Sequence, residues 1–254
     1  MSIITKTDAE IDLMREPCAI VRDTLAFVGE RISAGMSTKE VDELVERFIR
    51  AAGAYPSCLG YGGFPASACV SVNEVVVHGI PDEKTILKDG DIVSVDLCAY
   101  KNGFHGDAAR TFLIGNVSEE KRLLVERTKE CFFKGIENLH AGTPLYDIGY
   151  RVQKYAESFG YGVIRSYTGH GIGREMHEDP AVPNYGRLGT GPRLKANTVI
   201  CIEPMISMGN YRVRILDDDW GAVTIDGSPA AHYENTVALT SDGVLILTLV
   251  EQDF

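Results

Sequence analysis

The sequence DIVSVDLCAYKNGFHGDAARTF, residues 91–112, is the stretch that determines the fold. In its first half, apolar and other side chains alternate as they do along a β-strand. Asn102-Gly103 follows and is a turn signal, because both residues tolerate a positive φ. The stretch therefore predicts two antiparallel strands joined by a tight turn, with Asp96 on the first strand and Asp107 on the second.

Two loop lengths would place both carboxylates on the same face of this hairpin. With a loop of residues 102–103, Asp96 faces Ala109 and lies diagonal to Asp107. With a loop of residues 100–103, Asp96 faces Asp107 directly. Neighbouring carboxylates on a mostly apolar sheet raise each other's pKa, and a cation between them removes the repulsion. The hairpin alone is equally consistent with a metal site and with two solvated aspartates.

Length, composition and charge limit the classes of protein that this chain can be. It has 254 residues, of which 44% are hydrophobic and 24% charged, as expected of a globular protein with one large domain or two small ones. The net charge of −11 argues against a nucleic-acid surface. No apolar run reaches the ~18–20 residues of a membrane helix, and the N-terminus lacks the pattern of a signal peptide. The six cysteines contain no CxxC pair, which predicts free thiols in a reducing cytoplasm.

Capping boxes predict where two helices begin. Thr7 with Glu10 would start the first helix, which Pro17 would then kink or restart, and Ser37 with Glu40 would start the second. The remaining expected elements are helices at 118–140 and 142–160, a Gly- and His-rich loop at 168–180, and strands at 68–77, 162–167, 198–206, 211–216 and 232–249.

Two parts of the chain repeat one pattern at a constant spacing. Segments 34–53 and 141–160 share an Ala-Gly start, an apolar helical pattern and a final glycine. Likewise, LKDGDIVSVD ends at Asp96 and LKANTVICIE ends at Glu203. The spacing from position 34 to position 141 is the same as that from position 96 to position 203. The predicted repeats span roughly residues 34–112 and 141–240, within a single domain of residues 1–254.

The repeat gives each carboxylate of the hairpin a counterpart in the second half. Glu203 corresponds to Asp96, and Glu234 in YENTV is the counterpart expected for Asp107. Because Glu203 and Glu234 are further apart in sequence than Asp96 and Asp107, an insertion is expected between them in the second half. A pseudo-twofold fold would bring all four carboxylates together at its centre.

Four negative charges on buried strands need compensation, which two divalent cations would supply. His170 in TGHGIG is the expected neutral ligand, because its flanking glycines let the backbone bring the imidazole close to a metal. Oxygen donors with one imidazole favour Mn, Fe or Co and also accept Zn. A pair of such ions activates water and polarises carbonyls, so this cluster predicts a hydrolase.

Five motifs distributed along the chain carry a family resemblance. They are HGIP at 78–81, VDLCAYKNGFHGDAARTF at 95–112, TGHGIGREMHE at 168–178, IEPM at 202–205 and YENT at 233–236. Together they closely resemble the methionine aminopeptidases of the bacterial type I class, over essentially the whole chain. The resemblance implies the α+β pita-bread fold of the creatinases and aminopeptidases, with pseudo-twofold duplicated αβ halves around a central antiparallel sheet. It also implies metal-dependent removal of the initiator methionine where the second residue is small.

The resemblance further implies a role for each acidic site residue. The implied metal ligands are Asp96, Asp107, His170, Glu203 and Glu234. Asp96 would chelate one ion, and Asp107 and Glu234 would bridge the two. His170 and Glu203 would complete the coordination of the other ion, with Glu203 also acting as the general base.

Residues outside the metal ligands are implied to contact the substrate. His177 would bond the substrate carbonyl and the oxyanion, while His78 would contact the scissile nitrogen. The methionine side chain would need an apolar, adaptable pocket. Its implied lining is Cys58, Tyr61, Phe64, Cys69 and Trp220, with Met176 beside His177.

The chain departs from the family pattern at three positions. Met176 stands where an aromatic residue is usual, His232 where Gln is usual, and Asn235 where His is usual. None of these changes removes a ligand, so they bear on the pocket wall, the metal preference and the geometry. His105 is expected to be structural in the hairpin.

Two alternatives share the fold. A Xaa-Pro aminopeptidase or prolidase would carry a large extra N-terminal domain, whereas the catalytic pattern here begins near residue 1. A non-catalytic binding relative should have lost ligands, and this chain has all five. We expect a cytoplasmic monomer whose partners are nascent polypeptide N-termini and, transiently, the ribosome, with no nucleic-acid or membrane partner.

Overall fold

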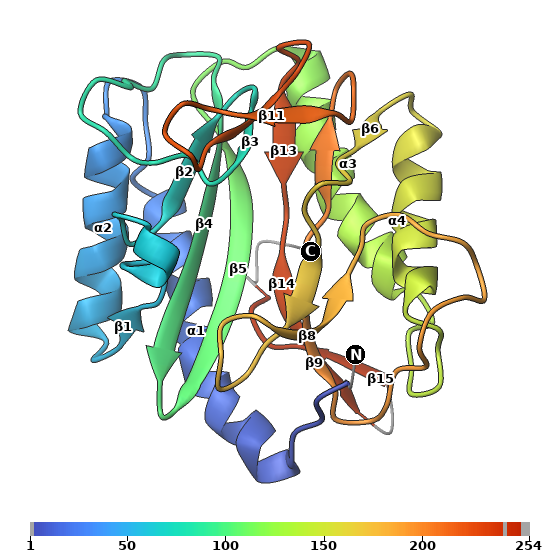
Figure 1. The fold of residues 1–254 in the computed structure, drawn as a ribbon. Helices are drawn as coiled ribbons and strands as arrows, with labels where there is room; N and C mark the ends of the chain where they lie inside the picture. Colours follow the sequence, from blue (N-terminus) through green and yellow to red (C-terminus); the bar gives the residue numbers. More distant parts are fainter. Residues whose placement is uncertain (1–2, 241–242, 250–254) are drawn as a thin grey trace.

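The computed structural model of the chain describes residues 3–240 and 243–249. In this part, the strands form four antiparallel sheets, with α1 and α2 on one side of the molecule and α3 and α4 on the other (Figure 1). The helices are α1 (Asp8–Gly29), α2 (Thr38–Ala51), α3 (Glu119–Ile136), α4 (Tyr146–Glu157) and a short 3₁₀ turn (Tyr61–Gly63). The strands are β1 (Tyr55–Pro56), β2 (Cys69–Val72), β3 (Val75–Val77), β4 (Ile92–Lys101), β5 (Phe104–Leu113), β6 (Gly162–Val163), β7 (Gly169–Gly171), β8 (Glu178–Val182), β9 (Val199–Ile202), β10 (Met205–Ser207), β11 (Val213–Ile215), β12 (Ala222–Thr224), β13 (Ala230–His232), β14 (Asn235–Thr240) and β15 (Gly243–Ile246). None of the described helices is both long and apolar enough to cross a membrane.

Both predicted capping boxes are present. Thr7 Oγ1 accepts a hydrogen bond from the Glu10 N–H at 3.2 Å, and the Glu10 carboxylate accepts one from the Thr7 N–H at 2.9 Å. Ser37 and Glu40 form the same pair at the start of α2. The expectation that Pro17 restarts the first helix is wrong, because α1 runs unbroken through it. Buried side chains on both sides of the proline hold the helix against the sheets, and this packing outweighs the hydrogen bond that proline cannot donate.

The hairpin of β4 and β5 has the two-residue loop. Asp96 pairs with Ala109, and Asp107 lies on the same face in a diagonal position. Asn102 has φ +56° and Gly103 has φ +83°, which are the left-handed values that such a turn requires. The four-residue loop is therefore wrong, and both carboxylates point to one face through the shorter turn.

Each half of the molecule has its own apolar core. In the first half, α1 and α2 cover β4 and β5, with Val21, Leu25, Val45 and Leu97 fully or almost fully buried. Burying each such side chain contributes roughly 1.5–3 kcal/mol. The hairpin approaches α1 closely at Gly106, where a Cβ would lie only 2.6 Å from the Cys18 backbone nitrogen. This close contact fixes the position of β5 against α1, and with it the position of Asp107, the next residue along the strand.

The same local geometry recurs in both halves at the spacing of the sequence repeat. The Gly35 N–H donates to the Leu87 carbonyl at 2.8 Å, and the Gly142 N–H donates to the Leu194 carbonyl at 2.8 Å. Both glycines have φ +95°. The first residues of β4 and β9, at positions 92 and 199, are separated by the same spacing.

Several strands differ from their expected bounds, and the differences matter for function. The strand expected at 198–206 is interrupted at Glu203-Pro204, where proline cannot donate to a sheet, and the one expected at 232–249 is interrupted before β14. The 168–180 loop contains β7 and β8, and the strand at 162–167 shrinks to β6. Glu203 and Glu234 thus lie where the chain leaves one sheet and enters another.

An inserted hairpin interrupts the second half. Strands β11 and β12 lie between β10 and β13, at the place where the sequence predicts the insertion. Strand β12 pairs with β3 of the first half, opposite Val77. The insertion therefore connects the two halves across the top of the molecule (Figure 1).

Candidate metal centre and substrate pocket

Five predicted ligands are brought to one place by five different segments of the chain. Asp96 and Asp107 come from β4 and β5, and His170 comes from β7. Glu203 follows β9 directly, and Glu234 lies between β13 and β14. All five line one cavity of about 140 Å³. The structure thus brings together side chains that are as distant in the sequence as Asp96 and Glu234.

The polar atoms of this cluster converge at short range. His170 Nε2 lies 3.7 Å from Asp107 Oδ2 and 3.7 Å from Glu203 Oε1. One ligand atom each from Asp107, His170, Glu234 and Cys201 lies within 4.8 Å of the others. Distances of this size leave room for a cation in contact with several of these atoms.

The orientation of His170 is fixed by its other ring nitrogen. Nδ1 lies 2.9 Å from the Gly171 carbonyl oxygen, which can only accept a hydrogen bond. Nδ1 therefore carries the proton, and Nε2 presents a lone pair toward the carboxylates. Burial lowers the pKa of His170 to about 3, so the ring is neutral near pH 7. A neutral imidazole with its lone pair aimed into an acidic cluster is a metal ligand in type and direction.

The electrostatics of the cluster also favour a bound cation. Burial, opposed by His232 and assisted by Glu203, raises the pKa of Asp96 to about 6. Burial and then the Asp96 charge raise the pKa of Asp107 well above its usual range. Burial is the first cause of the raised pKa values of Glu203 and Glu234 as well. A divalent cation would reverse all four shifts, because it favours the ionised carboxylates.

The pattern of hydrogen bonds supports the same fit. Among the described residues, Asp107 Oδ1 and Glu234 Oε1 are buried without a hydrogen-bond partner. Buried oxygens normally have a partner, so these two are candidates for bonds to an ion. The donor set of four carboxylates and one imidazole suits Mn, Fe, Co or Zn. The residues present therefore fit a divalent metal centre.

Backbone contacts between the halves hold the ligands in place. Thr236 Oγ1 accepts from the Asp107 N–H at 3.1 Å and donates to the Asp107 carbonyl at 2.8 Å. The Glu234 N–H donates to the Ala109 carbonyl at 3.0 Å. The Arg110 guanidinium donates to the Glu234 carbonyl at 2.6 Å. Because these bonds join β5 to the start of β14, Asp107 and Glu234 keep a constant separation.

An apolar pocket adjoins the acidic cavity. It has a volume of about 160 Å³ and shares His78, Asp96, Asp107 and His177 with the acidic cavity. Its other lining residues are Cys58, Tyr61, Phe64, Cys69, Met176 and Trp220. These are the six side chains predicted for the pocket, so the structure places all of them around one space next to the carboxylates.

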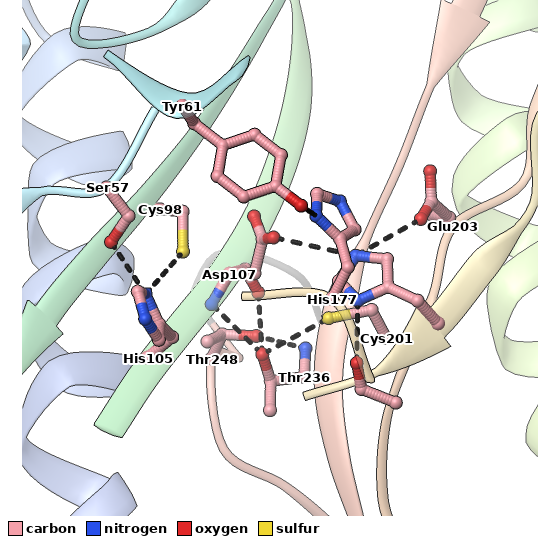
Figure 2. Close-up of polar contacts among 12 residues, drawn as sticks. Ser57, Tyr61, Cys98, His105, Asp107, His177, Cys201, Glu203, Thr236 and Thr248 are labelled. Carbon is pink, nitrogen blue, oxygen red and sulfur yellow. Dashed lines mark hydrogen bonds and ion pairs between the residues drawn. The ribbon is translucent and has the colours of Figure 1, made fainter. Parts of the chain in front are cut away.

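Two histidines border both cavities. His177 Nδ1 shares a 2.8 Å hydrogen bond with the Tyr61 hydroxyl, which Figure 2 shows reaching toward the ring. The centroids of the His177 and His170 rings are 4.2 Å apart. His78 has φ +59°, an uncommon conformation for a residue with a side chain. Its ring packs edge-on against Tyr167, and burial lowers its pKa to about 4.

Two residues of this region were not recognised as part of the centre from the sequence. Cys201 is fully buried with its sulfur among the ligand atoms of Asp107, His170 and Glu234. It lies two residues before Glu203, and the alternation of side chains along a strand would have placed both on one face. His232, noted in the sequence only as a departure from the family pattern, lies 3.5 Å from Glu203.

The contacts of Met176 and Asn235, the other two departures from the family pattern, and of His105 in the hairpin are defined by the structure. Met176 is buried in the pocket wall with Phe64, and Asn235 Oδ1 accepts from the Arg110 guanidinium at 2.8 Å. His105 Nδ1 lies 2.9 Å from Ser57 Oγ, away from the ligand cluster (Figure 2).

Known proteins with similar sequences and structures agree on one family. Residues 12–241 match the model described as Metallopeptidase family M24. The methionine aminopeptidase of Clostridium acetobutylicum is 55% identical over 249 residues, which cover 98% of this chain and 100% of that protein. The crystal structure of methionine aminopeptidase from Rickettsia prowazekii matches with a TM-score of 0.96 at 40% identity, covering 98% of this chain and 100% of that one. A prolidase from Pyrococcus furiosus matches with a TM-score of 0.77 at 26% identity, and the match covers 98% of this chain and 66% of the prolidase.

Proposed function

From the premise that the chain belongs to metallopeptidase family M24, and within it to the methionine aminopeptidases of the bacterial type I class, we propose that its acidic cavity holds two divalent cations. The fold is the pita-bread fold, and the chain is a metal-dependent hydrolase that removes N-terminal methionine.

We propose that Asp96, Asp107, His170, Glu203 and Glu234 are the metal ligands, and that Mn, Fe or Co is the metal. The observation that carries this proposal is the pair of partnerless buried oxygens, Asp107 Oδ1 and Glu234 Oε1, among the described residues. When bound, such cations polarise the scissile carbonyl and lower the pKa of water. Asp107 and Glu234, the bridging ligands that the family resemblance implies, would each have one such oxygen available for an ion.

The proton transfers fall to Glu203 in this proposal. It lines the acidic cavity, where its carboxylate can take a proton from the attacking water and pass it to the leaving amine. His177 stabilises the oxyanion of the substrate carbonyl. If the Tyr61 hydroxyl donates a hydrogen bond to His177 Nδ1, then the ring proton is on Nε2. The Nε2–H group can then donate a hydrogen bond to the oxyanion. His78, at the border of both cavities, contacts the scissile nitrogen.

The apolar pocket binds the methionine side chain in this proposal. Its aromatic and sulfur-containing walls suit an unbranched thioether. We further propose that a small second residue is preferred, that the enzyme acts in the cytoplasm as a monomer, and that its substrates are nascent chains met during a transient contact with the ribosome. A binding role without catalysis is less well supported, because no ligand of the set is missing.

Peptide hydrolysis by the manganese- or cobalt-loaded protein tests the pocket. We expect Met-Ala-Ser to be cleaved and Ala-Ala-Ser to be left intact, because alanine cannot fill the thioether pocket. Met-Leu-Ser serves as the probe for the second residue and should be cleaved poorly. Equal rates for Met-Ala-Ser and Ala-Ala-Ser would contradict a methionine pocket.

Replacement of Glu203 tests the proton transfers. We expect Glu203→Ala to abolish turnover while circular dichroism shows an unchanged fold, because the general base and one ligand are lost together. The matched control is Glu137→Ala, which removes an exposed carboxylate far along the chain. Near-normal activity of Glu203→Ala would remove this residue from the proposed mechanism.

A further inference from the structure

We propose that His232 is a positioning residue that donates a hydrogen bond from Nε2–H to Glu203, and that it thereby sets how tightly the centre binds divalent cations. This inference rests on the proposed function, because Glu203 is a proposed ligand. It concerns a residue that lies outside the five ligands and does not touch the substrate pocket.

The geometry places Glu203 between two imidazoles. His232 Nε2 lies 3.5 Å from Glu203 Oε2, and His170 Nε2 lies 3.7 Å from Glu203 Oε1. His170 has its proton on Nδ1, which donates to a carbonyl, so it offers the carboxylate no N–H. His232 is therefore the neighbouring imidazole that can donate to Glu203.

His232 also lacks any other use for its ring nitrogens. The residue is 1% exposed, and within the described part of the chain neither Nδ1 nor Nε2 has a hydrogen-bond partner. A buried imidazole without a partner is costly, so the ring should bond to the acceptor beside it. The separation of 3.5 Å between His232 Nε2 and Glu203 Oε2 brings these two atoms within reach of such a bond.

The backbone of His232 is anchored to the strand that carries Asp107. Thr111 Oγ1 accepts from the His232 N–H at 3.0 Å and donates to the His232 carbonyl at 2.9 Å. On the other side, His232 pairs with Met205, two residues after Glu203. The ring therefore has a fixed position relative to both the hairpin and the carboxylate, as a positioning residue requires.

The expected effect of this bond is on metal affinity. A hydrogen-bonded partner holds a ligating carboxylate in the orientation that the metal needs, and loss of such a partner typically weakens binding about 10–100-fold. Without His232, Glu203 would lose its neighbouring N–H donor, since His170 offers the carboxylate no proton.

Two amide variants distinguish the ring nitrogens. The amide nitrogen of glutamine falls near the position of histidine Nε2, whereas that of asparagine falls near Nδ1. We expect His232→Gln to bind Mn²⁺ or Co²⁺ within a few-fold of the unaltered protein and His232→Asn to bind about 10–100-fold more weakly. Calorimetric titration of the metal-free proteins measures this without recourse to activity. If His232→Asn does not fold, His232→Leu takes its place with the same expectation.

The control is His105→Asn, which removes a half-buried imidazole whose Nδ1 bonds to Ser57 instead of a proposed ligand. Its metal affinity should stay unchanged. Unaltered affinity in His232→Asn, equal losses in the Gln and Asn variants, or an equal loss in His105→Asn would each overturn the inference. If the unaltered protein bound neither metal, the proposed function would fail first.

Discussion

The tasks of the histidines around the centre follow from what their ring nitrogens face. Burial lowers the pKa of both His170 and His105, to about 3 and about 4. His170 uses Nδ1 on a carbonyl and turns Nε2 toward carboxylates. His105 instead shares Nδ1 with the Ser57 hydroxyl and lies 3.8 Å from the Cys98 sulfur. One ring is therefore a ligand in type, and the other is part of the packing.

The lowered pKa of His105 predicts a pH-dependent contribution to stability. Burial and the nearby His177 lower this pKa from 6.5 to about 4. The unfolded chain therefore binds a proton between these pH values that the folded chain does not, so this contribution is lost as the pH falls from 6.5 toward 4. We expect the unfolding free energy of the unaltered protein, relative to His105→Gln, to fall by on the order of 1 kcal/mol between pH 7 and pH 4.5, after allowance for the partial exposure of the ring.

Urea unfolding of the metal-free proteins at the two pH values measures the difference. Carboxylates with raised pKa values titrate in the opposite sense, but they are the same in both proteins and cancel. A difference that stayed constant with pH, or that grew on acidification, would contradict the assignment.

At the scale of residues, the sequence predicts which side chains share a face of the hairpin better than it predicts which residues pair across its two strands. The adjacency of Asp96 and Asp107 follows from alternation, but both loop lengths satisfy it. The choice between them depends on two consecutive residues with positive φ, which Asn102 and Gly103 tolerate without requiring. Cys201 gives no signal of its own, because a buried cysteine is most often simply a small apolar residue.

At the scale of elements, the centre lies where strands are interrupted. Glu203 and Glu234 each stand between two short strands that belong to different sheets. The alternation of side chains extends across such an interruption, so sequence patterns predict one long strand there. In segment 168–180 the sequence predicts a loop, whereas the structure has the strands β7 and β8. The glycines of β7, which are typical of loops, are needed here because neighbouring backbone approaches them closely.

The N-terminal segment is joined to the loop that carries His177. Lys6 Nζ lies 2.5 Å from Glu178 Oε2, and the two side chains are only 4% and 7% exposed. We expect Lys6→Met to destabilise the protein by about 3–5 kcal/mol, because it leaves a buried carboxylate without its partner. The resulting movement of the loop should also raise KM for Met-Ala-Ser. Thermal unfolding and steady-state kinetics measure both effects.

Lys134→Met is the matched control, because its ion pair with Glu137 has side chains 48% and 55% exposed. Such a pair contributes about 0–1 kcal/mol. If the two variants lost equal stability, the buried pair would have no special role. Adding Glu178→Gln to Lys6→Met should recover part of the loss, since the unpaired charge is then gone.

At the scale of the whole molecule, we propose that the two halves are a duplication within a single domain. The recurring glycine turns and their constant spacing support this, as does the division of the ligand set between the halves. The spacing alone predicts the correspondence of Glu203 with Asp96. It does not predict how the sheets of the two halves join, because the hydrogen bonds between β5 and the start of β14 depend on contacts far apart in sequence.

This arrangement predicts one cooperative response to metal removal. Asp96 and Asp107 come from the first half and the other three proposed ligands from the second, so a bound cation stabilises both at once. At a free-metal concentration of about 100 times Kd, the gain is about 2.7 kcal/mol. We expect calorimetry to show a single transition that moves to lower temperature when a chelator is added. Two separate transitions, or a shift confined to one of them, would contradict a shared centre.

The inserted hairpin of β11 and β12 contributes to the substrate pocket but carries none of the five proposed metal ligands. It lies outside the duplicated frame, yet the tryptophan at its tip forms one wall of the apolar pocket beside Phe64. The proposed metal ligands lie in the two proposed repeats, whereas one wall of the proposed methionine pocket lies in the insertion. Exchange of residues 209–229 is therefore expected to change which N-terminal side chains the pocket accepts, while the five proposed metal ligands stay in place.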